Sequence, residues 1–141
     1  MPWRRVHTNL DPALPPDCTN CRPADGGGIL NLVFFSAKKY PNVKLGVISA
    51  NEDDVMRFFY GFGEMNCTAA GNYPAGKFTQ AITDLRTQAM PYRTQFSSYY
   101  VNGIKHMYSQ FDDFYQPLSG GTTIASWETD LLAGKTSAIG P

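Results

Sequence analysis

The stretch VKLGVISANEDD, residues 43–54, decides the fold of this chain. Its first part is a short run rich in β-branched residues, which predicts a buried strand of a parallel sheet over residues 43–49. The strand runs into three successive acids, Glu52, Asp53 and Asp54. A second run, FSSYYV at 96–101, predicts another strand, and the loop after it carries His106. An acid after one strand and a histidine after the next is the most informative pattern in the sequence.

Before, between and after these two strands, apolar residues recur at helical spacing. It predicts helices over 29–40, 54–62 and 77–90, and a last helix that begins after Thr123 and is closed by Gly134. The helix at 77–90 crosses between the strands, and a right-handed crossover makes them parallel. The acidic loop and the histidine loop should therefore leave the sheet at the same carboxyl edge, where such sheets bind ligands.

Two further expectations concern single segments. In the helix at 54–62 we expect Val55, Phe58 and Phe59 to point inward, and Gly61 and Gly63 to end the helix. Residues 1–28 hold five prolines and a run of three glycines, which predicts an irregular arm. Residues 29–141 then form a single α/β domain.

Composition restricts the partners of the chain. Twelve basic residues balance twelve acidic ones, so no excess charge exists to hold a nucleic-acid backbone or an anionic membrane surface. No apolar run approaches the roughly 20 residues of a membrane-spanning helix, and residues 1–5 lack the apolar stretch of a secretion signal. We expect a soluble chain without an export signal, with no nucleic-acid or membrane partner and with an uncharged substrate; the sequence assigns no compartment.

The three cysteines leave their redox state open. If Cys18 and Cys21 bond to each other, Cys67 remains unpaired. A Cys-x-x-Cys segment can also supply half of a zinc site, but the other half needs a second close pair, and only Cys67, His7 and His106 remain for it. We therefore expect no resident cofactor.

Asp53 and His106 suit the acid and base roles of a hydrolytic triad. In such a site the carboxylate fixes the imidazole tautomer, and the imidazole moves a proton to and from the nucleophile. The competing interpretation is that Asp53 caps the helix beginning near Asp54, while His106 is an ordinary loop histidine. Sequence does not rank the neighbouring acids securely, so Asp54 stays a second candidate beside Asp53.

A family resemblance adds to this interpretation. It rests on short segments that span the chain from about Trp3 onward: PDCTNC at 16–21, YPNV at 40–43, FFYG at 58–61, FSSYY at 96–100 through His106, FY at 114–115 through Trp127, and LLAG at 131–134. Together they resemble the carboxyl-terminal part of pectin-acetylesterase-like α/β hydrolases. The resemblance implies that Asp53 and His106 are triad members. It also implies exported relatives that act on acetylated polysaccharide.

The resemblance also implies a truncated α/β-hydrolase fold. The glycine-rich oxyanion segment and the Gly-x-Ser-x-Gly elbow of that family would lie upstream of Met1. Without them, three nucleophiles are open, in this order: water activated by His106, the thiol of Cys18 or Cys21, and a metal-bound hydroxide. Candidate metal ligands are His106, Asp53, Asp54, Glu52 and His7.

Two hypotheses for function follow. The first is a hydrolase of small activated esters that works through Asp53 and His106 without the usual serine. The second is a catalytically silent fragment that folds but only binds. In both, two parallel strands leave two open edges and an uncovered apolar face, so we expect a homodimer whose copies complete one another.

Overall fold

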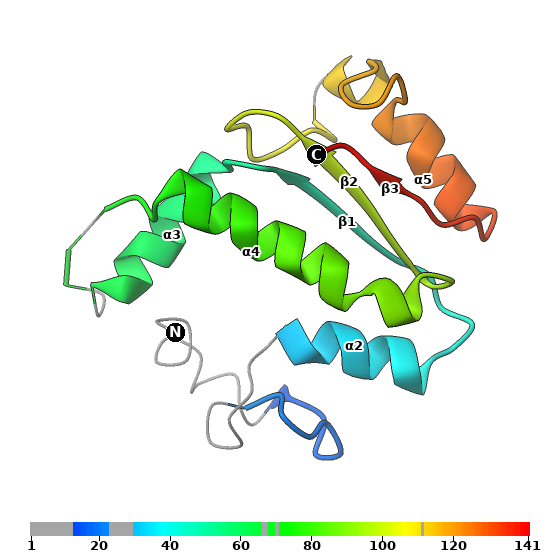
Figure 1. Ribbon diagram of the computed structural model, residues 1–141, viewed down its shortest axis with the longest axis horizontal. Coiled ribbons are helices and arrows are strands. Elements are labelled where there is room, and N and C mark those ends of the chain that lie inside the picture. The colour runs from blue at the N-terminus through cyan, green and yellow to red at the C-terminus, as the bar shows by residue number, and fades with distance from the viewer. Residues whose placement is uncertain (1–12, 23–29, 66–67, 70, 111) are drawn as a thin grey trace.

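The computed structural model describes residues 13–22, 30–65, 68–69, 71–110 and 112–141. Helices surround a small parallel sheet, which makes this an α/β fold (Figure 1). In chain order the elements are α2 (Leu30–Lys39), β1 (Leu45–Ala50), α3 (Asp54–Glu64), α4 (Ala75–Gln88), the 3₁₀ helix η3 (Met90–Tyr92), β2 (Phe96–Val101), the 3₁₀ helix η4 (Asp112–Tyr115), α5 (Ile124–Leu132) and β3 (Ala138–Ile139).

The sheet has the strand order β1-β2-β3, and both neighbouring pairs are parallel. The second predicted strand is confirmed with its bounds, and the parallel crossover through α4 is confirmed as well. The register pairs Leu45 with Phe96 and Ala50 with Val101. Sequence did not predict β3, which pairs with the centre of β2 through two residues only. One edge of β2 is therefore covered rather than open.

The expectation that the first strand is buried is wrong for part of β1. Its side chains alternate between half-buried and exposed positions, and the side chain of Ile48 is 41% exposed. The reason is its place in the sheet, because β1 is an edge strand with β2 on one side only. β2, between two neighbours, is buried along its whole length.

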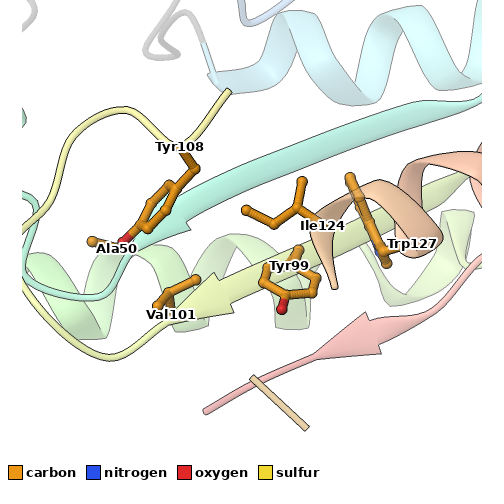
Figure 2. Close-up of a cluster of buried hydrophobic side chains, with 6 residues drawn as sticks. All are labelled: Ala50, Tyr99, Val101, Tyr108, Ile124 and Trp127. Atoms are coloured by element: carbon orange, nitrogen blue, oxygen red, sulfur yellow. The ribbon is translucent and has the colours of Figure 1, made fainter. Parts of the chain in front are cut away.

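Helices cover both faces of the sheet. On one face Tyr99 and Val101 of β2 pack with Ile124 and Trp127 of α5, as Figure 2 shows. On the other face the hydroxyl of Tyr100 donates to a main-chain carbonyl of α4 at 2.9 Å. The long α4 crosses this second face in Figure 1. The described chain thus has the layered arrangement of an α/β domain.

The orientation expected for α3 is wrong. Val55, Phe58 and Phe59 are exposed, and the helix continues past Gly61 to Glu64. The main chain of Gly71 and Tyr73 instead lies against the helix at Gly61. A Cβ on Gly61 would lie 1.6 Å from the carbonyl oxygen of Gly71, so only glycine permits this approach.

Thr123 and Gly134 lie beside the two ends of α5, where the sequence places them. The Thr123 hydroxyl accepts a hydrogen bond from the N–H of Ser126 at 3.0 Å, which confirms the predicted cap of α5. Gly134 follows α5 with φ +87°, a conformation that favours glycine.

In the arm, the described residues 13–22 lack regular strands and helices longer than a turn, and a Cys18–Cys21 disulfide packs against α2. The remainder of the arm lies outside the described residues.

Candidate active site

The loops after β1 and β2 are joined at the carboxyl edge of the sheet. The N–H groups of Asn51 and Glu52 donate to the carbonyl oxygens of Val101 and Gly103 at 2.9 and 3.0 Å. These bonds extend the pairing of β1 with β2 beyond the last strand residues. Figure 1 shows both strands pointing to this edge, where α3 begins. The acid of one loop and the histidine of the other are therefore carried to the same place.

Asp53 and His106 meet there in direct contact. The imidazole Nδ1 lies 2.9 Å from Oδ2 and 3.1 Å from Oδ1 of the carboxylate. Asp53 is 2% exposed, whereas 38% of the His106 side chain is exposed. The structure thus brings together the two residues that the sequence singled out, with the acid buried and the base open to solvent. The catalytic role of the pair stays a prediction.

Asp53 also caps α3. Its Oδ1 accepts a hydrogen bond from the N–H of Met56 at 2.8 Å, the third residue of the helix. A carboxylate accepts several hydrogen bonds at once, so it can serve the helix end and the imidazole together. The capping contact and the contact with His106, stated above as competing interpretations, are therefore both present.

The contact determines which imidazole nitrogen can act as a base. An ionised carboxylate only accepts hydrogen bonds, so in the neutral imidazole Nδ1 carries the proton that faces Asp53. The other nitrogen, Nε2, then carries the free lone pair. A lone pair on a partly exposed, oriented imidazole is suited to removing a proton from water or from a hydroxyl group.

The neighbouring acid Asp54 has other partners. Its carboxylate is exposed, accepts a hydrogen bond from Asn72 at 3.1 Å and lies 3.7 Å from the guanidinium of Arg57. The structure does not bring Asp54 onto the imidazole. Of the two candidate acids, Asp53 is the one that contacts His106.

Tyr108 anchors the histidine loop two residues after His106. It belongs to the buried cluster beneath α5, and in Figure 2 its ring lies beside Ala50 at the end of β1. Burial raises the pKa of the Tyr108 phenol, and the negative charges of Asp53 and Asp113 add to this rise. Tyr108 was not predicted from the sequence, although an aromatic residue two positions after the histidine is a local signal for such an anchor.

The structure also bears on the other nucleophiles. Cys18 and Cys21 are buried and bonded to each other, so neither is a free thiol that His106 could activate. Cys67 and His7 lie outside the described residues. Among the residues that the structure describes, no three His, Cys, Asp or Glu side chains gather as a metal-binding group.

No described helix has the length and apolar character needed to cross a membrane. Comparisons of the chain with protein-family models, with curated proteins and with solved structures find no match.

Proposed function

We propose that this chain is an ester hydrolase in which His106, oriented by Asp53, acts as a general base on water. The observation that supports this most is the contact between Nδ1 and a carboxylate that is 2% exposed, at the carboxyl edge of a parallel sheet. Buried acids beside an open imidazole are typical of sites that move protons. The substrate class is a small activated ester.

The reaction would proceed in two proton transfers. Nε2 takes a proton from water as the water oxygen bonds to the acyl carbon, and the π electrons of the carbonyl move onto its oxygen. The tetrahedral intermediate collapses, the bond to the leaving oxygen breaks, and the imidazolium returns the proton to that oxygen. The carboxylate of Asp53 stabilises the imidazolium between the two steps. No covalent bond to the enzyme forms, and esters with good leaving groups are favoured.

A silent fragment is the second candidate, and one observation favours it. The bond from Met56 N–H to Asp53 gives this buried carboxylate a structural role that needs no catalysis. A chromogenic acetate ester separates the two candidates. We expect turnover above buffer in the wild-type chain and its loss in His106→Ala, with Asp54→Asn as the matched control that keeps activity. Wild-type turnover equal to that of buffer would favour the silent fragment. Full turnover in His106→Ala would mean that another group acts as the base.

The same assay addresses a metal-dependent hydrolase, which stays a further alternative. If His106 alone activates the water, a strong chelator should leave turnover unchanged. Loss of turnover with the chelator, and its return with a divalent ion, would replace the water mechanism by a metal-bound hydroxide.

We also propose that the domain is the carboxyl-terminal part of a pectin-acetylesterase-like hydrolase fold and that two copies complete one another. The family part rests on the sequence resemblance. Support for the association comes from β1, an edge strand whose Ile48 is 41% exposed, and from the exposed Phe58 and Phe59 of α3. Equal numbers of acidic and basic residues leave no net charge to keep two copies apart.

Light scattering tests this association. We expect a dimer at micromolar concentration and a shift to monomer in Ile48→Lys, because a charge at a sheet edge opposes pairing. Leu132→Lys is the matched control, since Leu132 is 82% exposed on α5. A monomeric wild-type chain at micromolar concentration would contradict the proposal.

A further inference from the structure

We propose that Asn51 is a positioning residue that sets the separation of Asp53 and His106. Its side-chain hydrogen bonds, which we call the hook, join the histidine loop to the acidic loop. Its side chain makes two hydrogen bonds across the edge of the sheet. Oδ1 accepts from the N–H of Gly103 at 2.9 Å, and Nδ2 donates to Oδ1 of Asn102 at 3.0 Å. Asn51 stands two residues before Asp53, and Gly103 stands three residues before His106.

The main chain of Asn51 is tied to two further elements. Its N–H donates to Val101 at the end of β2, and its carbonyl oxygen accepts from the Thr79 hydroxyl of α4 at 2.8 Å. The residue is therefore held by β2 and α4 while its side chain holds the loop. Because β2 and α4 hold the main chain of Asn51, its side chain can fix the position of the histidine loop relative to the sheet.

The loop needs such a hook because its turn is built on an unusual backbone. Gly103 has φ +130°, a conformation that glycine adopts readily and other residues rarely do. A Cβ at Gly103 would meet no atom within 4 Å, so packing does not fix this turn. Hydrogen bonds hold it instead: the N–H of Gly103 donates to Asn51, and the carbonyl oxygens of Gly103 and Ile104 accept from the N–H groups of Glu52 and Asp54 at 3.0 Å. The bond to Asn51 is the one of these that a side-chain substitution removes.

The catalytic consequence rests on the proposed function, but the geometric part does not. Without the hook, the histidine loop loses the side-chain bonds that fix its turn, and the imidazole should spend less time against Asp53. A misplacement of about 1 Å can cost about a hundredfold in rate when a reaction depends on alignment. We expect Asn51→Ala to lower kcat by about tenfold to a hundredfold while KM changes little.

Imidazole nitrogen NMR tests the geometry without any substrate. The chain has two histidines, so His7→Gln assigns the signals of His106. In the neutral form of the ring, we expect the wild-type chain to hold its proton on Nδ1. Asn51→Ala should shift the population toward the form protonated on Nε2. Asn72→Ala is the matched control, because Asn72 bonds Asp54 and not the histidine loop.

Two further variants keep the proposal open to refutation if Asn51→Ala does not fold. Asn102→Ala removes only the Nδ2 bond from an exposed residue and should shift the tautomer in the same direction, by less. Asn102→Asp keeps the acceptor and should restore the wild-type tautomer. Folded variants without either bond that keep the wild-type tautomer would overturn the proposal, even if the wild-type chain hydrolyses no ester. A tautomer shift in a chain without turnover would support the hook and reject the proposed function.

Discussion

Substitutions of Asp53 should separate its two roles, because the carboxylate serves a helix and an imidazole at once. Asp53→Asn keeps an oxygen that can accept from the N–H of Met56, but it turns an amide N–H₂ group toward Nδ1 of His106. Asp53→Ala removes both contacts. The two variants should therefore differ in stability and agree in activity.

The magnitudes follow from the contacts. Loss of an N-cap costs about 1 kcal/mol, and loss of the hydrogen bond to a partly exposed imidazole costs about 1 kcal/mol more. Asp53→Ala should thus lower the free energy of unfolding by about 2 kcal/mol. Asp53→Asn should lower it by less than about 1 kcal/mol, because the amide keeps the cap and replaces the carboxylate–imidazole bond by a weaker neutral one. For activity, an amide that donates to Nδ1 selects the tautomer with the proton on Nε2, so no lone pair is left for water. General-base catalysis contributes about a hundredfold or more, and either variant should lose it.

Urea unfolding and the hydrolysis of a chromogenic ester measure these two quantities on the same samples. Asp54→Asn is the control, because Asp54 is exposed and contacts Arg57 and Asn72 instead of His106. If Asp53→Asn kept the wild-type kcat/KM, the carboxylate would not orient the base. If Asp53→Ala were as stable as Asp53→Asn, the cap would contribute nothing and our account of α3 would fail.

Other predictions concern the stability of the fold. Arg86 donates to Ser98 at 2.9 Å and to three main-chain oxygens in and after β3 at 2.8–3.0 Å, so Arg86→Ala should cost about 2–3 kcal/mol in urea unfolding, and Arg86→Lys should recover only part of it. An unchanged free energy of unfolding in Arg86→Ala would show that these hydrogen bonds do not stabilise β3. Gly61→Ala should cost about 2 kcal/mol or more, because its Cβ would overlap the carbonyl of Gly71; an unchanged unfolding midpoint would contradict that close approach. Burial raises the pKa of the Tyr99 and Tyr100 phenols above the usual value of about 10, so their contribution to stability is complete below pH 10 and is lost as pH rises through the raised pKa values. Urea unfolding at pH 9 and pH 11 checks this, and equal stability at both would refute it.

Local patterns were sufficient to predict the elements that carry the site. β2 has the predicted bounds because a run rich in aromatic residues ends at Asn102–Gly103, a strong turn signal. Thr123 caps α5 because a hydroxyl before an apolar helical run satisfies a free N–H. Parallel topology placed Asp53 and His106 at one edge, since the carboxyl ends of neighbouring parallel strands meet there. Their direct contact did not follow from topology, and it was expected only with the family resemblance added.

The features that sequence did not predict depend on contacts between distant segments. β3 has only two paired residues, and it is held by the Arg86 side chain from α4 and by hydrogen bonds from Ser137 to β2. The apolar face of α3 is exposed because a returning chain occupies the side at Gly61, which periodicity alone cannot reveal. The hook at Asn51 had no signal at all, because asparagine after a strand is common in any turn.

The most direct test of the account is the pH dependence of ester hydrolysis by the wild-type chain beside His106→Ala. A neutral imidazole acting on water predicts a wild-type rate that falls as pH is lowered and histidine takes up a proton, together with a variant whose rate stays at the buffer level throughout. The same pH profile and the same rate in both chains would contradict the claim that His106 is the base.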